Sequence, residues 1–179
     1  MRNWNSPLLF QGWIYCLVVL FFHLIWENFE TEIDAFPPFI FLSDAIGNVL
    51  LSVIPLLINP VIDTDIIRQD VSLILPNGLY LSYFFYLSGI KQMCLIICLF
   101  IIAQGPWKKK VWFIPAALAV MQITVFVRFF LLSIYCMYQP EQLNLMKDWL
   151  FTPLFYAEIL IIWMAWVLLV AQTASLRNR

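Results

Sequence analysis

Four long runs of apolar residues constrain this chain more than any other feature of its sequence. A transmembrane helix needs about 20 residues to cross the ~30 Å hydrocarbon core of a bilayer. The chain is also 63% hydrophobic and only 12% charged, whereas soluble domains average about 25% charged residues. We therefore predict one all-α polytopic membrane domain over residues 1–179, with about four transmembrane helices. The predicted spans are roughly 8–26, 88–105, 111–137 and 150–172.

Two segments between the first and second spans differ from the spans in their amino-acid composition. Residues 39–58 are apolar but carry small and polar side chains, which favour an interfacial or half-inserted helix; these are Ser43, Asp44, Gly47, Asn48 and Pro55. Farther along, two β-prone runs at 71–75 and 79–84 flank Asn77-Gly78. Asn-Gly between such runs is a strong hairpin signal, because turn residues with positive φ favour these two residue types. We therefore predict a small β-hairpin.

Charged residues orient the chain in the bilayer. The lysines of segment 108–110 separate the second and third spans and indicate a cytoplasmic loop, while segment 27–38 is acidic and belongs outside. A fifth span at 39–58 would move the lysines to the outer face. The consistent solution has four spans, both termini in the cytoplasm, and segment 39–58 and the hairpin on the outer side. No small-residue cleavage site follows the first span, so we expect it to be retained.

Composition also limits the cofactors and partners. The net charge of −1 gives no support for nucleic-acid binding. The single histidine and the four cysteines form no metal-ligand pattern, so we predict no metal and no cofactor. The cysteines lie in apolar runs and read as small buried residues; they are Cys16, Cys94, Cys98 and Cys136.

Ionisable residues inside the spans are candidates for function, since each costs about 2.5–3.5 kcal/mol at the bilayer centre. Arg128 and Glu158 fall at similar depths on neighbouring antiparallel spans, and we predict an ion pair between them. This pair has a purely structural reading of similar weight. With Lys91 and Lys147, Arg128 would form an outer cationic pocket suited to a carboxylate or phosphate group.

The order of these elements resembles the exosortase/archaeosortase family, in particular its short bacterial members. The resemblance covers most of the chain and is best over 70–172. It implies an inner-membrane cysteine transpeptidase that processes C-terminal sorting signals of exported proteins, with its pocket facing the periplasm. The motifs that carry it are Leu75-Pro76-Asn77-Gly78, Leu87-Ser88-Gly89, Trp112-Phe113-Ile114-Pro115, Val125-Phe126-Val127-Arg128 and Lys147-Asp148.

The departures from the family pattern affect its chemistry directly. Leu87 occupies the position of the family's nucleophilic cysteine, Lys147 that of its histidine, and Val125 that of an asparagine. Of the catalytic trio that the resemblance implies, only Arg128 remains. Since leucine has no nucleophilic atom, the transpeptidase reaction of the family is not expected here.

Three functions follow from this pattern. The first is a non-catalytic homologue that binds an exported protein's C-terminal peptide, a lipid head group or a partner membrane protein. The predicted binding residues are Ser88, Gly89, Lys91, Arg128, Asp148 and Glu158. The second is a structural subunit of a larger membrane complex. The third, ranked lowest, is an active hydrolase with a displaced nucleophile, either Ser88 or Cys94 paired with His23.

Overall fold

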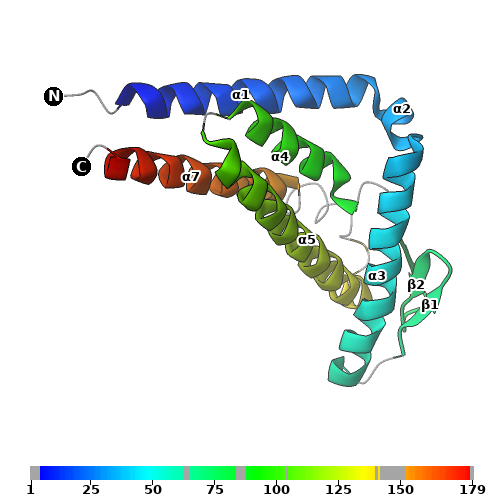
Figure 1. Ribbon diagram of the computed structural model, residues 1–179. Coiled ribbons are helices and arrows are strands. Elements are labelled where there is room, and N and C mark those ends of the chain that lie inside the picture. Colours follow the sequence, from blue (N-terminus) through cyan, green and yellow to red (C-terminus); the bar gives the residue numbers. More distant parts are fainter. Residues whose placement is uncertain are drawn as a thin grey trace. The chain divides into compact units, whose positions relative to one another are not determined.

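The computed structural model describes residues 5–62, 65–83, 88–103, 105–139, 141 and 152–177. Helices dominate this part of the chain, as predicted, and a small sheet lies between the third and fourth of them in sequence (Figure 1). The helices are α1 (Asn5–Asn28), α2 (Glu30–Asp34), α3 (Pro37–Ile62), α4 (Ile90–Ile102), α5 (Trp107–Tyr138) and α7 (Thr152–Arg177). The strands are β1 (Ile67–Gln69), β2 (Ser72–Ile74) and β3 (Tyr80–Ser82).

The chain divides into two compact units. The first unit comprises Met1–Glu30, Lys91–Met121 and Leu154–Arg179, and so holds α1, most of α4, the first half of α5 and α7. The second comprises Thr31–Ile90 and Gln122–Pro153, and so holds α3, the sheet, the start of α4 and the second half of α5. Helix α5 thus runs through both units, and each unit is described by itself below.

Aromatic rings form the core of the first unit. The Trp166 ring lies 5.5 Å from the Phe100 ring and 5.3 Å from the Phe113 ring, measured between ring centroids. Phe100 and Phe113 are themselves 5.1 Å apart. Tilted and edge-on pairs at such distances are favourable beyond the area that they bury. These contacts join α4, α5 and α7, and they depend on ring shape rather than on polar groups.

Helix α4 is shorter than the apolar run that predicted it. Its 13 residues span ~20 Å at about 1.5 Å per residue, and Gly105, with a φ of 144°, precedes Pro106 just beyond its end. Lys110 was expected to lie in a cytoplasmic loop, but it belongs to the first turn of α5 and is 3% exposed. Its Nζ donates hydrogen bonds to the carbonyl oxygens of Ala103 (2.6 Å) and Ile101 (3.4 Å). This lysine therefore satisfies carbonyls at the end of α4 that have no partner within the helix.

Helix α3 carries the sheet of the second unit, and β1 and β2 run beside it in Figure 1. Arg68 of β1 reaches the middle of α3, where its guanidinium donates to Asn48 Oδ1 and Ser52 Oγ, each at 2.6 Å. Nearer the end of α3, Asn59 exchanges two hydrogen bonds with the Ile66 backbone, at 3.0 and 3.2 Å. The sheet is thus fixed along the C-terminal half of α3 by side-chain hydrogen bonds.

The hairpin forms where it was predicted, but it belongs to an antiparallel sheet of three strands in the order β1-β2-β3. Its turn also differs from the expected one, in which both Asn77 and Gly78 have positive φ. Only Gly78 does, at 78°, and its N–H donates to the Leu75 carbonyl at 2.9 Å. Pro76 then occupies the second position of a type I turn, and Gly78 forms the bulge that follows it. Strand β1 was not predicted, because its exposed Ile67-Arg68-Gln69 lacks the apolar alternation of a strand.

Within the described residues, two helices are long and apolar enough to cross a membrane, namely Pro37–Pro60 and Trp107–Tyr138. Ile90–Ile102 and Pro153–Leu169 form shorter apolar helices. These lengths support a membrane protein in the coarse sense. Segment 39–58 is one continuous helix instead of a broken or half-length one, so its length alone does not exclude a crossing.

Candidate functional site

The candidate site begins at the residues that open α4. The hydroxyl of Ser88 accepts a hydrogen bond from the Ile90 N–H at 3.2 Å, as a helix-capping side chain does. Gly89 adopts a left-handed conformation with a φ of +74°. A Cβ at that position would lie 2.7 Å from Cγ2 of Val125, so the backbone here packs directly on α5. Ser88 and Gly89 are therefore held in one fixed turn, and the Ser88 side chain is fully buried.

Tyr83 connects this turn to α3 and α5. Its ring packs edge-on against Phe129, with centroids 6.1 Å apart, and its edge occupies the space that a side chain at Gly47 would fill. Its hydroxyl is buried near the side chains of Ser43 and Ser88, although neither reaches hydrogen-bond geometry. Burial raises the pKa of Tyr83, and the two nearby serine hydroxyls partly oppose that rise. The phenol is thus held in its neutral form.

Two further contacts attach α5 to the site. Gln122 Nε2 donates to the Ser88 carbonyl at 3.5 Å, so α5 contacts the backbone of the turn at both Ser88 and Gly89. At the end of α5, Asn77 Nδ2 donates to the carbonyls of Cys136 (2.9 Å) and Met137 (3.3 Å). The hairpin turn is thereby anchored to α5, and the site lies between the anchored hairpin and the start of α4 in sequence.

The structure describes some of the predicted site residues and leaves others outside the described part of the chain. Arg128 is half-buried on α5, one turn after Val125, and Ser88 and Gly89 meet that helix as described. Lys91 belongs to the first unit, as does Glu158 on α7. Because Arg128 lies in the second unit, its ion pair with Glu158 stays a prediction. Positions 87, 147 and 148 lie outside the described residues, so the predicted roles of Leu87, Lys147 and Asp148 also stay predictions.

Sequence reasoning missed Tyr83, Ser43 and Gly47 as parts of this site. Ser43 and Gly47 are one helical turn apart on α3, so both lie on one face of that helix. This stripe of small residues was the available signal, since a bulky partner must fill the space that it leaves. Tyr83, just after β3, is that partner.

Two observations bear on the chemistry of the site. Ser88 is buried, and its Oγ caps α4 by accepting a hydrogen bond from the Ile90 N–H. No group of three or more His, Cys, Asp or Glu that could hold a metal ion occurs in the part of the chain that the structure describes. No family model, curated protein or solved structure matches this chain. Evidence for its function therefore comes from its own residues and contacts.

Proposed function

We propose that this chain is an exosortase-like inner-membrane protein that has lost transpeptidase chemistry and retains the outer pocket for binding. The observation that carries the proposal is the packing of the Ser88-Gly89 turn against Val125, one turn before Arg128. Ser88-Gly89 and Arg128 are the retained residues of the family's Cys-Ser-Gly and Asn-x-x-Arg motifs, and Val125 stands at the asparagine position. The ligands that suit a pocket with a retained arginine are a peptide carboxylate, a lipid head group or a polar segment of a partner membrane protein.

Two contacts weigh against the active-hydrolase alternative. A nucleophilic serine needs an accessible hydroxyl with a base beside it, whereas Ser88 Oγ is buried and accepts a backbone hydrogen bond. A catalytic Cys94–His23 pair is also disfavoured, because both ring nitrogens of His23 have other partners. Nε2 lies 2.9 Å from Glu27, and Nδ1 lies 3.4 Å from Tyr156.

The proposed topology keeps four spans and places α3 on the outer side. Arg68 and the strand that carries it lie against the middle of α3, at Asn48 and Ser52. If the middle of α3 lay at the bilayer centre, the sheet would bring an arginine and the unpaired backbone groups of a strand edge into hydrocarbon. Both are costly there. An outer, interfacial α3 leaves the sheet in water and keeps the lysines of segment 108–110 in the cytoplasm.

Fusion reporters test this topology. We expect an alkaline phosphatase fused after residue 65, and another fused after residue 139, to be active on the outer side of the membrane. A fluorescent protein fused after residue 105 should fluoresce in the cytoplasm. If the fusion after residue 65 were instead cytoplasmic, α3 would cross the membrane and the four-span proposal would fail.

Photocrosslinking in native membranes tests binding. A photoreactive residue at Leu87, the position of the family's cysteine, should crosslink a discrete peptide, lipid or protein. The matched control replaces Leu131, an exposed leucine on α5, and should give only diffuse lipid adducts. Equal products at both positions, or none above an unrelated four-span protein, would refute the binding function.

A structural subunit remains the second candidate, and the outward face of α1 favours it. Large apolar side chains there are exposed in the isolated chain, with Trp13 and Phe21 at 68% each. A helix of another subunit could pack against such a face. The Arg128→Leu variant separates the two functions: a folded protein that loses its Leu87 crosslinks favours the binding pocket, and a misfolded one favours a structural role.

A further inference from the structure

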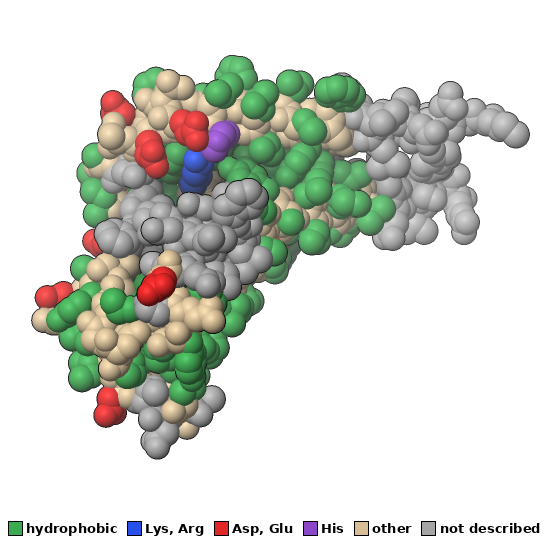
Figure 2. Space-filling model, turned by 180° about the vertical axis from the view of Figure 1, so that it is seen from behind, with side chains coloured by type: hydrophobic (Ala, Val, Ile, Leu, Met, Phe, Trp, Pro, Cys, Tyr) green, Lys and Arg blue, Asp and Glu red, His purple; other side chains and the backbone are tan. Residues whose placement is uncertain are grey.

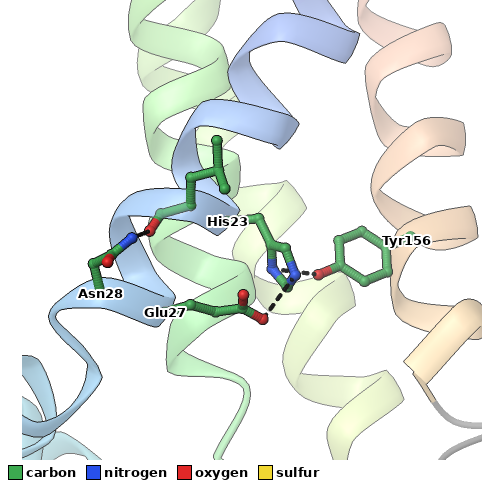
Figure 3. Close-up of polar contacts among 5 residues, drawn as sticks. His23, Glu27, Asn28 and Tyr156 are labelled. Atoms are coloured by element: carbon green, nitrogen blue, oxygen red, sulfur yellow. Dashed lines mark hydrogen bonds and ion pairs between the residues drawn. The ribbon is translucent and has the colours of Figure 1, made fainter.

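A second polar cluster, away from the family's motifs, lies at the end of α1 in the first unit. His23 Nε2 forms a 2.9 Å ion pair with Glu27 Oε1, one turn farther along the same helix. Tyr156 of α7 brings its hydroxyl to 3.4 Å from His23 Nδ1. Figure 3 shows the three side chains pointing toward one another from the two helices. The His23 and Glu27 side chains are 41% and 57% exposed, so a ligand can reach both.

Lys91 adds a cation to the same end of α1. Its ammonium lies 5.9 Å from the centre of the Trp26 ring, and Trp26 precedes Glu27. Within the described chain, Lys91 has no hydrogen bond or ion pair to balance its charge. The Trp26 ring is itself held by Phe22, with centroids 5.5 Å apart. The structure therefore presents an ammonium on an aromatic base beside the His23–Glu27 pair.

The helix ends at this cluster favour a bound anion. Lys91 is the second residue of α4 and Tyr156 the fifth of α7, so both stand near the positive end of a helix dipole. The Tyr156 hydroxyl lies beside His23 Nδ1, and a phenol hydroxyl can both accept and donate a hydrogen bond. Lys91 and Tyr156 thus provide two groups that can donate to an anionic oxygen.

Acidic groups lie beside these donors. Glu27 is exposed, and Glu30 follows it within the same unit. Figure 2 shows acidic side chains, a basic side chain and the histidine gathered at one end of α1, on a surface that is otherwise largely hydrophobic. A simple anion would be repelled by these carboxylates. A ligand that carries an anion and a cation a few ångströms apart would satisfy both halves of the cluster.

We propose that this cluster binds the phosphate–ammonium head group of a zwitterionic phospholipid of the ethanolamine type. Lys91 and Tyr156 hold the phosphate, and Glu27 holds the ammonium while orienting His23. The assignment rests on the proposed membrane placement, since the end of a spanning α1 is where lipid phosphates lie. A primary ammonium donates three hydrogen bonds and so suits carboxylates, whereas a choline head group donates none.

Native mass spectrometry of the detergent-purified chain tests the site. Equimolar phosphatidylethanolamine, phosphatidylglycerol and phosphatidylcholine are added, and the bound lipid is counted. We expect phosphatidylethanolamine to be retained about tenfold over phosphatidylcholine, since about one charge-assisted hydrogen bond distinguishes them. Soluble phosphoethanolamine should displace it, and inorganic phosphate at the same concentration should do so less well.

Variants assign the two halves of the head group. Lys91→Ala should weaken the binding of all phospholipids about tenfold, whereas Lys108→Ala, the same change at an exposed lysine in the first turn of α5, should not. Glu27→Gln should remove the preference for ethanolamine. Tyr156→Phe should weaken phosphate retention, with Tyr138→Phe, an exposed tyrosine of the other unit, as its control.

The outcomes distinguish this inference from the proposed function. Equal retention of the three lipids, preference for phosphatidylglycerol, or full preference in Glu27→Gln would overturn the head-group site. Extraction of the chain from membranes by alkaline carbonate would instead overturn the membrane placement. A chain that resists carbonate and lacks lipid preference would leave the proposed function intact and remove only this site.

Discussion

Each of the two units of this protein is stabilised internally by a different kind of contact. In the first unit, Phe100, Phe113 and Trp166 pack ring against ring across three helices. In the second, Arg68, Asn59 and Asn77 tie strands and turns to helices through hydrogen bonds to backbone and side-chain oxygens. Aromatic packing leaves no polar group unsatisfied, so it is compatible with a lipid environment. Polar side chains and strand edges are favourable where water can satisfy their remaining hydrogen-bonding groups. The difference agrees with the proposal that the sheet lies outside the bilayer.

The largest effect is expected from the aromatic core. Trp166→Ala removes a ring that is 1% exposed and contacts two others, and we expect it to lower the free energy of unfolding by about 3 kcal/mol or more. Reversible unfolding in mixed micelles measures the change. Trp112→Ala, at a tryptophan that is 82% exposed, is the matched control and should stay within about 0.5 kcal/mol of the native protein. Equal losses in the two variants would contradict the aromatic-core account.

The next effect probes the turn at the candidate site. Gly89→Ala places a Cβ 2.7 Å from Val125 in a left-handed conformation, and we expect a loss of about 2 kcal/mol. Val125→Ala in the same chain should recover part of it by removing the clash, a coupling that a double-mutant cycle measures. Gly78→Ala, where φ is also positive but no atom lies within 4 Å, should cost only the backbone strain, about 1 kcal/mol. A Gly89→Ala loss no larger than this, or one that Val125→Ala does not reduce, would refute the close packing.

These glycines illustrate what sequence can reveal. The Asn-Gly signal located the hairpin because a turn of that kind is specified by two adjacent residues. It did not give the turn type, since Pro76 occupies the second turn position and only Gly78 has positive φ. Helical content followed from the length of the apolar runs, which is a local property. The partner of the carbonyls at the end of α4 was not visible, because it is Lys110 of the next helix.

The residues of the candidate site show the same difference between local and long-range determinants. Ser88, Gly89 and Val125 were identified because they fall on motifs with a fixed order. Tyr83 was missed, because its place depends on a gap at Gly47 that appears only when α3 and the segment after β3 meet. The partners of His23 were missed for a related reason: Glu27 is one turn away in sequence, but Tyr156 lies 133 residues farther along. Local spacing predicts the first kind of contact and not the second.

A smaller effect is expected at the edge of the sheet. Arg68→Met removes hydrogen bonds from β1 to Asn48 and Ser52 on α3, and we expect a loss of about 1 kcal/mol because the arginine is exposed. The effect should concentrate in β1, so hydrogen exchange of the amides at 66–69 is the more sensitive measurement. Lys108→Met, an exposed basic residue on α5, is the control. Faster exchange in the aromatic unit, with β1 unchanged, would contradict the assigned role of Arg68.

The smallest expected effect on stability concerns Tyr83 and appears only at alkaline pH. Burial raises the pKa of its phenol above the ordinary value of 10.0, so between those two values the folded chain binds more protons than the unfolded chain. Stability from the buried phenol is therefore complete below pH ~10 and is lost as the pH rises through the folded-state pKa. Unfolding midpoints at pH 8 and pH ~10.5 should differ more for the native protein than for Tyr83→Phe, which has no proton to lose. Tyr80→Phe, at an exposed tyrosine of β3, is the control and should keep the native pH dependence. If Tyr83→Phe kept it too, the hydroxyl would be in contact with water, and the close fit of Tyr83 against α3 and the Ser88 turn would be wrong.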